Sequence, residues 1–260
     1  MRLVAALLAI TSLGGGARAE VVRAQIASKR GARDVTVILP PGYTPRRRYP
    51  VLYMLDGQNL TEHPWFSGGW RAEEGLHRAV HEGKSEPMIV VGVHAGDRVN
   101  EYTSVPDADE GGGAADAFVH HLVKDVVPWV GRNYAVRRGK QSRAIGGASL
   151  GANAALHAVL TRGDVFGRAL VMSPSLWWAE GALYDQVRRS RTIRQQHVVL
   201  YNGGDDDGRE ETEALRDLLH KKGLVFDRSL HHWTEPSGNH DEPSWARFFP
   251  HALERLFPAR

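Results

Sequence analysis

The sequence predicts an α/β fold with a mostly parallel central sheet, helices on both of its faces, and an antiparallel hairpin at its amino-terminal edge. Three observations lead to this prediction. Short apolar runs without polar alternation, typical of strands buried on both faces, recur along the chain. Segments with helical periodicity stand between these runs, as in βαβ units. Two β-prone stretches separated by Arg30-Gly31 precede them, as in a hairpin.

The expected elements follow one another without a break. The hairpin comprises residues 21–28 and 34–39. The buried strands are expected at residues 51–55, 88–93, 143–145, 169–172 and 198–201. The helices are expected at residues 71–81, 114–130, 150–161, 181–194, 210–222 and 245–256. No internal repeat, linker or change in composition interrupts residues 20–260, which predicts a single domain.

The first 19 residues have the three regions of a secretory signal peptide. A basic start at Arg2 is followed by an apolar run over residues 3–10 and by Ala17-Arg18-Ala19, the small-x-small pattern that signal peptidase accepts. The apolar run is shorter than the roughly 20 residues that a transmembrane helix needs; a buried terminal helix or strand is the alternative. We therefore expect cleavage between Ala19 and Glu20, export to the periplasm or the cell exterior, and no stable membrane insertion.

The composition excludes several classes of function. Because the chain has no cysteine, thiol catalysis and thiolate metal sites are ruled out. The formal net charge of +3 gives little support for a nucleic-acid partner. The basic run Arg46-Arg47-Arg48, flanked by prolines, is typical of a solvated loop. No pattern in the chain points to a cofactor.

The strongest functional signal is Gly147-x-Ser149-x-Gly151. It stands between a short apolar strand and a small-residue helix, which is the context of the nucleophile elbow in the α/β-hydrolase fold. The flanking glycines allow the close backbone approach that such a tight turn needs; a purely structural glycine turn is the alternative. We expect the Ser149 hydroxyl to be a nucleophile, with the Leu150 N–H as one donor of an oxyanion hole.

A serine nucleophile needs a base, which in this fold follows it along the chain. The histidines that do so are His157, His197, His220, His231, His232, His240 and His251. His240 lies in a turn-rich loop between the last expected strand and the last helix, where the base belongs. His231 or His232, at a strand end, is the alternative.

The acid of a catalytic triad is expected after the strand over residues 198–201. Asp205, Asp206 and Asp207 stand there, three carboxylates where one is needed to fix the tautomer of the base. The residue pattern leaves all three open. A calcium loop is the alternative, but its ligand spacing and terminal glutamate are absent, so no metal is expected.

Two further loops are expected to contribute to the site. The second oxyanion donor should come from Asp56-Gly57-Gln58-Asn59, which follows the strand over residues 51–55. Aromatic residues in other loops are candidates for the walls of a substrate cleft: Trp65, Phe66, Trp70, Trp177 and Trp178. Adjacent aromatic residues in loops favour a cleft wall over a place in the core.

From about Arg33 to Phe257, the chain resembles the esterase family that includes enterochelin (siderophore) esterases, esterase D, feruloyl esterases and the mycolyltransferase antigens. The resemblance rests on ordered motifs: Tyr53 to Asn59, Arg98 with Glu101-Tyr102-Thr103, Gly147 to Gly151, Phe166-Gly167 with Ser173 to Trp178, and Gly238 to Glu242 with Trp245. The chain departs from the pattern at Ala152, where relatives usually carry a second glycine.

The resemblance implies roles for particular residues. Ser149 would be the nucleophile, His240 the base, and the backbone N–H groups of Gln58 and Leu150 the oxyanion hole. Counted from the glycines after the strand, the acid would be Asp207, with Asp206 and Asp205 as alternates. Some siderophore esterases of this group work with a Ser–His pair and no clear acid. Contacts to the substrate are expected from Trp70, Arg98, Trp177 and Trp178.

The sequence therefore predicts an exported serine esterase that hydrolyses a small-molecule ester through an acyl-enzyme, without a cofactor. By analogy with the family, the substrate would be a siderophore ester or another aryl or acyl ester. Two alternatives remain beside this prediction. One is acyl transfer of the mycolyltransferase type, in which an alcohol replaces water. The other is a non-catalytic module that binds glycan through its tryptophans.

Overall fold

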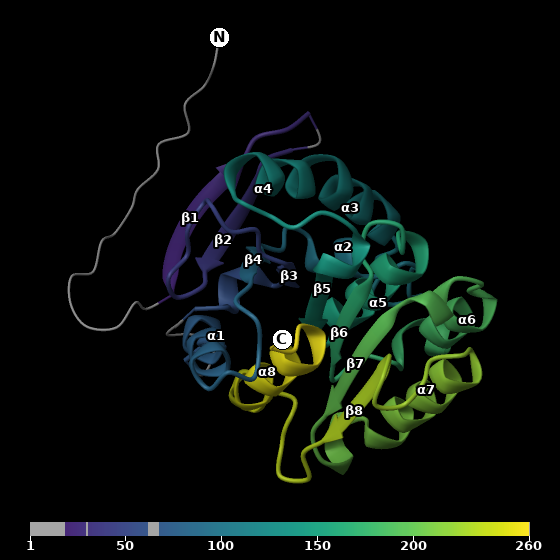
Figure 1. Ribbon diagram of the computed structural model, residues 1–260. Helices are drawn as coiled ribbons and strands as arrows, with labels where there is room; N and C mark the ends of the chain where they lie inside the picture. The colour runs from purple at the N-terminus through teal and green to yellow at the C-terminus, as the bar shows by residue number, and fades with distance from the viewer. Residues whose placement is uncertain (1–18, 30, 62–67, 260) are drawn as a thin grey trace.

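A computed structural model describes residues 19–29, 31–61 and 68–259 of the protein. At its centre is an eight-stranded sheet within these residues (Figure 1). The strands are β1 (Glu20–Ile26), β2 (Arg33–Leu39), β3 (Val51–Leu55), β4 (Ile89–Val93), β5 (Arg143–Ala148), β6 (Arg168–Met172), β7 (His197–Asn202) and β8 (Leu230–Thr234). The predicted leader, apart from Ala19, and the aromatic residues Trp65 and Phe66 lie outside the described residues.

The strands are arranged in the order β1-β2-β4-β3-β5-β6-β7-β8. β1 pairs antiparallel with β2, with Glu20 opposite Leu39 and Ile26 opposite Arg33, so the predicted hairpin is confirmed. β2 is also antiparallel to β4, whereas every pair from β4 to β8 is parallel. Because parallel strands end at the same edge of a sheet, the loops after β3, β5, β6 and β7 meet at one edge.

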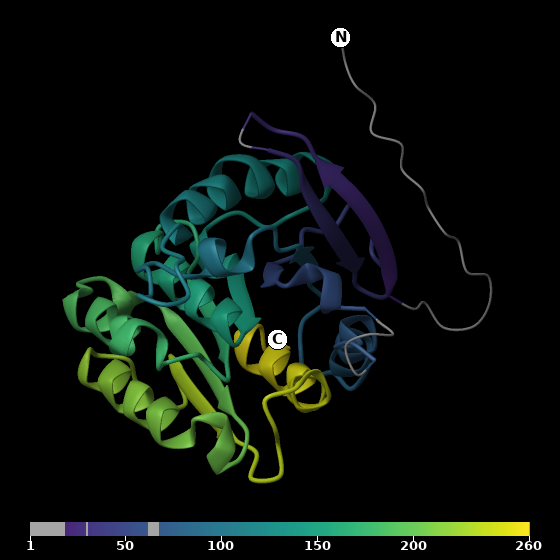
Figure 2. The same cartoon turned by 180° about the vertical axis from the view of Figure 1, so that it is seen from behind.

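Helices cover both faces of the sheet, as predicted (Figures 1 and 2). They are α1 (Ala72–His81), α2 (Arg98–Tyr102), α3 (Ala115–His121), α4 (Val127–Asn133), α5 (Leu150–Thr161), α6 (Ala182–Arg189), α7 (Arg209–Lys221) and α8 (Glu242–Leu256). Side chains of α1 and α8 pack in the hydrophobic cluster on one face, and those of α2 to α7 pack in the cluster on the other. None of the described helices is long and apolar enough to cross a membrane.

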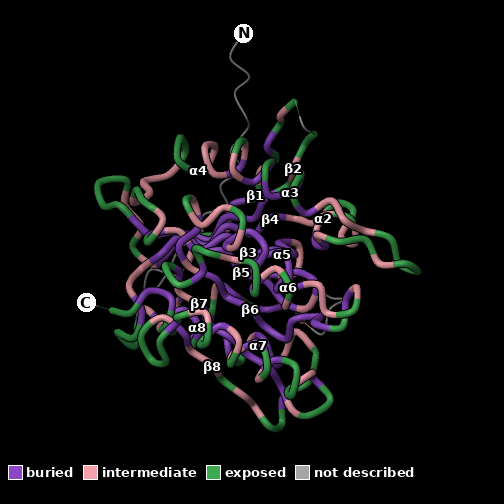
Figure 3. The backbone as a smooth tube through the Cα atoms, turned by 90° about the vertical axis from the view of Figure 1, so that its right-hand side faces the viewer, coloured by how far each residue is buried: buried purple, intermediate pink, exposed green. Residues whose placement is uncertain are grey.

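The central strands β3 and β4 are buried on both faces, which explains why their sequences lack polar alternation (Figure 3). In β3, Tyr53 and Leu55 point into one hydrophobic cluster, while Leu52 and Met54 point into the other. Each fully buried side chain of this size stabilises the fold by about 1.5–3 kcal/mol relative to exposure. Two large apolar clusters allow a chain without disulfides to hold a rigid sheet edge for a functional site.

Two predicted helices differ from the observed ones. The helix expected over residues 114–130 is interrupted by a π-helical turn at Leu122–Val126. Pro128 has no N–H to donate to the carbonyl of Lys124, one turn earlier, so the regular ladder breaks there. The helix expected over residues 181–194 is shorter, because Ser190 adopts an extended backbone and ends α6 at Arg189.

The sequence did not predict α2. Five residues are too few for an apolar period to emerge. Its one local signal is Asp97, whose side chain accepts a hydrogen bond from the Asn100 N–H at 3.2 Å and so caps the helix. The helix matters for the site because it carries Arg98 and Tyr102 to the sheet edge at which β3 ends.

Candidate active site

Ser149 lies on the turn between β5 and α5. Its φ of 57° and ψ of −129° belong to a backbone region that costs a non-glycine residue roughly 1–3 kcal/mol. Neighbouring structure enforces this turn, since the Ser149 N–H donates to the Met172 carbonyl at 3.0 Å. A Cβ on Gly147 would lie 2.6 Å from the carbonyl carbon of Gly151, so glycine is required there. The strand–turn–helix arrangement expected around Ser149 is therefore present.

A second hydroxyl lies beside that of Ser149. The two Oγ atoms of Ser149 and Ser175 are 3.1 Å apart. Ser175 is buried in the loop after β6, and its carbonyl accepts a hydrogen bond from Asn153 Nδ2 at 2.8 Å. In the sequence, Ser175 stands out only as part of the motif from Ser173 to Trp178. Nothing in its spacing marked it as a neighbour of Ser149, because the two residues come together through the pairing of β5 with β6.

Asp207 and His240 form a hydrogen-bonded pair. His240 Nδ1 is 2.6 Å from Asp207 Oδ1, and the Asp207 residue is only 5% exposed. Asp205 and Asp206 are exposed, and Asp205 lies 3.4 Å from the Arg209 guanidinium. Of the three carboxylates that the sequence left open, Asp207 is the one that contacts a histidine in the described part of the chain.

The loops that carry Asp207 and His240 approach each other at two glycines. The Gly204 N–H donates to the Gly238 carbonyl at 2.8 Å. A Cβ on Gly203 would lie 2.5 Å from the same carbonyl oxygen, so no larger residue fits at that position. The Gly203 N–H, in turn, donates to Asp207 Oδ2 at 2.5 Å. The glycines after β7 thus allow the contact between the carboxylate and the imidazole.

Besides Asp207, residues at the start of α8 orient His240. Asp241 caps this helix, accepting from the Ser244 N–H at 2.9 Å, and the rings of Trp245 and His240 form a T-shaped pair with centroids 5.3 Å apart. The His240 side chain is 45% exposed, which leaves it accessible from solvent. No hydrogen bond joins the described side chains of His240 and Ser149; such bonds are often long before a substrate binds.

The alternative histidines are held elsewhere. His231 and His232 lie inside β8 and not at its end as expected. Burial lowers the pKa of His232 to about 4, and its Nε2 is 2.7 Å from Asn202 Oδ1. Burial likewise lowers the pKa of His197 to about 3, and its ring packs on that of His231. His197 and His232 are therefore neutral near pH 7 and engaged within the strands.

An ion pair fastens the loop after β3 to Arg98 at the start of α2. The buried Asp56 has a φ of 55°, and its two carboxylate oxygens accept from Arg98 Nε and Nη2, each at 3.0 Å. Arg98 Nη2 also lies 3.5 Å from the carbonyl of Ala148, the last residue of β5. The Gln58 side chain bridges Asp56 Oδ1 and the Ala95 N–H. These contacts fix the backbone of the loop that contains Gln58.

A family model described as "Putative esterase" matches residues 27–256. The chain belongs to this esterase family. It is a carboxylic ester hydrolase, and its substrate is a small-molecule ester. The protein YbbA of Bacillus subtilis is 27% identical over 246 residues, which cover 88% of this chain and 94% of YbbA. Endo-1,4-beta-xylanase Y of Acetivibrio thermocellus is 21% identical over 221 residues, or 77% of this chain and 19% of that longer protein.

Solved structures share the fold of this esterase. A ferulic acid esterase superposes with a TM-score of 0.75 at 19% identity, over 92% of this chain and 98% of that one. The enterobactin esterase FES from Shigella flexneri, in the presence of enterobactin, superposes with a TM-score of 0.73 at 21% identity, over 91% of this chain and 58% of that one. The mostly parallel sheet with its antiparallel hairpin is therefore the α/β-hydrolase fold that the sequence predicted.

The tryptophans of the esterase differ in exposure, which corrects the expectation that they wall a cleft together. Trp70 is 2% exposed and packs against Trp245 and Phe249 in the core. The positive φ of Gly69, which no side chain would fit, turns the chain inward there. Trp178 is also buried, and its indole N–H donates to the Val105 carbonyl at 2.9 Å. Trp177 alone of these three indoles is well exposed, at 66%.

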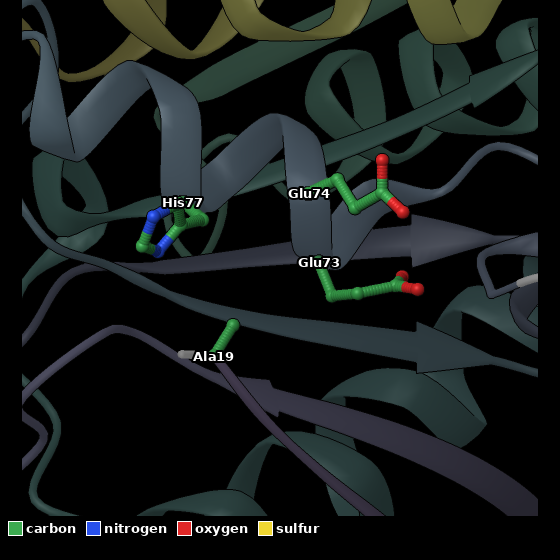
Figure 4. Close-up of a pocket in the computed structure, with 4 residues that line it drawn as sticks. All are labelled: Ala19, Glu73, Glu74 and His77. Carbon is green, nitrogen blue, oxygen red and sulfur yellow. The ribbon is translucent and has the colours of Figure 1, made fainter. Parts of the chain in front are cut away.

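Two of the cavities in the described part of the esterase lie apart from Ser149. One of about 530 Å³ is lined by Ala19, Glu73, Glu74 and His77, beside the start of β1 and the first turns of α1 (Figure 4). Another, of about 620 Å³, lies between α5 and α6 and includes His157. Neither is lined by Ser149, Asp207 or His240, so cavity size alone does not point to these three residues.

Proposed function

We propose that the protein hydrolyses esters through a Ser149–His240–Asp207 triad and an acyl-enzyme. The observation that carries this proposal is the 2.6 Å hydrogen bond between His240 Nδ1 and the buried Asp207. Asp207 follows β7 and His240 follows β8, at the same edge of the sheet as the strained turn at Ser149 after β5. A carboxylate in this position keeps the proton on Nδ1 of the imidazole. The unprotonated Nε2 is then free to act as a base towards Ser149.

In the proposed mechanism, His240 Nε2 takes the Ser149 proton while Oγ attacks the ester carbonyl carbon. A tetrahedral oxyanion forms, and its collapse breaks the bond to the leaving alkoxide, which receives the proton from His240. Water then attacks the acyl-serine by the same route and releases the acid. Asp207 stays ionised throughout and stabilises the transient imidazolium.

The backbone N–H groups of Leu150 and Gln58 are the proposed oxyanion hole. Leu150 opens α5, where the first N–H groups have no carbonyl partner within the helix. The positive end of the helix dipole adds to the attraction for an oxyanion. The Gln58 backbone is held by the Asp56–Arg98 pair, so its N–H is preorganised. Each such donor is worth about 3–4 kcal/mol in the transition state.

The proposed substrate is an aryl or acyl ester of the siderophore or feruloyl kind. The solved structures of this fold include a ferulic acid esterase and an enterobactin esterase, which supports an aromatic acyl group. Trp177 offers an exposed indole two residues beyond Ser175, on the loop that contacts Ser149. Trp178 and Trp70 lie too deep for direct contact, and we propose that they support the site from beneath.

We also propose that the enzyme is exported after cleavage between Ala19 and Glu20. The order of basic, apolar and small-residue regions in the first 19 residues supports this. The position of the first strand supports it too, since β1 begins at Glu20, directly after the proposed cleavage site. The mature chain would then keep the whole sheet and lose only the leader.

The test combines a covalent probe with a substrate panel, using residues 20–260. A fluorophosphonate is expected to modify Ser149, as read by peptide mass spectrometry. Aryl esters, including p-nitrophenyl acetate, methyl ferulate and a catechoyl-serine ester, are expected to be hydrolysed to the free acid. An added alcohol acceptor separates acyl transfer, which would yield a new ester. Labelling at another serine, or no labelling and no turnover, would overturn the proposal.

Replacing Arg98 with lysine is expected to lower kcat for a neutral p-nitrophenyl ester by about 10-fold. Lysine keeps the charge but cannot hold both oxygens of Asp56, so the loop of Gln58 loosens. Arg98 Nη1 has no hydrogen-bond partner among the described residues, and we propose that it contacts the substrate. An anionic aryl ester should therefore also show a higher KM. Unchanged kinetics with both esters would contradict this role.

A further inference from the structure

The carboxylate of Asp207 receives more hydrogen bonds than the one from His240. Its Oδ2 accepts from the Ser173 hydroxyl at 2.5 Å and from the Gly203 N–H at 2.5 Å. The Ser173 oxygen itself accepts from the indole N–H of Trp245 at 2.9 Å. A chain of hydrogen bonds thus runs from Trp245 through Ser173 and Asp207 to His240.

The direction of this chain is fixed by chemistry. An indole N–H can only donate, so the Ser173 oxygen must be the acceptor of that bond. A serine hydroxyl has one proton, and the ionised carboxylate can only accept, so this proton points to Asp207. Trp245 therefore determines how the Ser173 hydroxyl is oriented, and Ser173, together with the Gly203 N–H, determines which carboxylate oxygen remains for His240.

The chain is buried and built from separate parts of the fold. Ser173, Asp207 and Trp245 are exposed by 1%, 5% and 7%. They come from the loop after β6, the loop after β7 and the first turns of α8, which packs on both strands (Figure 1). Ser173 has a φ of 44°, a left-handed conformation that disfavours most side chains. Hydrogen bonds are stronger in such a dry environment, and a missing partner is costly.

We propose that Ser173 and Trp245 are positioning residues that act on His240 through Asp207. This inference rests on the proposed function, because it takes Asp207 and His240 as the acid and the base. The two donors on Oδ2 hold that oxygen and turn Oδ1 toward His240 Nδ1. They also spread its negative charge, which sets how strongly Asp207 favours the imidazolium over the neutral ring.

A purely structural role for Trp245 is the rival explanation, since its ring also packs edge-on against His240 and on Trp70. Trp245→Phe separates the two roles, because phenylalanine keeps an aromatic ring and removes the N–H. Ser173→Ala removes the hydroxyl that transmits the effect. Trp233→Phe, at an exposed position on β8, is the matched control for loss of an indole.

The experiment measures kcat/KM against pH for a p-nitrophenyl ester with both single variants, the double variant and the control. Ser173→Ala is expected to lower kcat/KM by roughly 10-fold, as for loss of a hydrogen bond to a charged group. The acidic limb of its profile of kcat/KM against pH should move to higher pH, because the less stabilised Asp207 carboxylate attracts the proton of the His240 imidazolium more strongly. Trp245→Phe should shift both quantities in the same direction by less. The double variant should match Ser173→Ala, because the indole acts through the hydroxyl.

Two outcomes would overturn the proposal: an unshifted acidic limb in Trp245→Phe and Ser173→Ala, or effects that simply multiply in the double variant. If Ser173→Ala lowers the melting temperature too far for kinetic measurements, the acidic limb of the pH profile of Trp245→Phe alone decides between the two roles. The downfield proton resonance of His240 Nδ1–H needs no turnover. A shift of this resonance in the variants would support the positioning role of Ser173 and Trp245 even if Ser149→Ala kept full activity and the proposed function failed. An unchanged resonance would contradict that role.

Discussion

Replacing Ser149 with alanine is expected to lower kcat for p-nitrophenyl ester hydrolysis by about a million-fold. The strained turn after β5 presents one side chain at the amino end of α5, and alanine leaves no atom there to form the acyl-enzyme. His240→Ala should cause a similar loss, because an unassisted serine hydroxyl is a poor nucleophile at pH 7. Steady-state rates with the mature chain, corrected for spontaneous hydrolysis, give both values.

In the proposed triad, Ser149, His240 and Asp207 act as a unit, which makes this prediction sharper. The double variant Ser149→Ala with His240→Ala should be no slower than either single variant, because the first substitution already removes the whole covalent route. Ser190→Ala, at the end of α6, is the control for a serine substitution away from the site. If Ser149→Ala kept a substantial rate, another nucleophile or direct attack by water would have to replace the proposed route.

The nearby Ser175 is a more demanding comparison. Its hydroxyl is 3.1 Å from that of Ser149, so a general disturbance of the loop would affect both variants alike. Ser175→Ala removes one hydrogen bond to Ser149 and should change kcat by about 10-fold or less. The ratio of the kcat values of Ser175→Ala and Ser149→Ala measures how far the reaction depends on Ser149 itself.

The fold could be predicted because burial on both faces leaves a direct trace in the sequence. Strands such as β3 and β4 have no charged or strongly polar residue, and several such runs between amphipathic helices are typical of a parallel sheet covered on both faces. The elbow was equally visible, since the backbone of Gly151 lies so close to Gly147 that a side chain at position 147 would not fit. In each case the structure requires a particular type of residue at a particular position, and that requirement is visible in the sequence.

The functional site was less predictable, because the direction in which a side chain points decides which residues meet there. The run Asp205 to Asp207 forms a short 3₁₀ turn that ends at Gly208, and that turn sends one carboxylate inward and two outward. Trp70 differs from the expectation for a similar reason, because the turn at Gly69 directs it into the core. Ser175 and Ser173 were not singled out at all. Their roles arise from strand pairing, which no spacing within the chain records.

Replacing Asp207 with asparagine is expected to lower kcat by about 10,000-fold, because it would reverse the hydrogen bond to His240. Ser173 and Gly203 both donate to Oδ2, so the amide of an asparagine must turn its oxygen toward them. Its NH₂ group would then face His240 Nδ1 and force that nitrogen to accept. The proton would move to Nε2, and the imidazole could no longer take a proton from Ser149.

The neighbouring carboxylates supply matched controls for this reversal. Asp206→Asn and Asp205→Asn make the same chemical change one and two residues away, at exposed positions, and each should alter kcat by less than about 3-fold. All three rates are measured with one p-nitrophenyl ester near neutral pH, alongside the melting temperatures of the variants. A loss confined to Asp207→Asn identifies the acid by its hydrogen bonds and not by the charge of the cluster. Equal losses in all three would make the cluster's field the cause, and wild-type activity in Asp207→Asn would leave a Ser149–His240 pair that works without an acid.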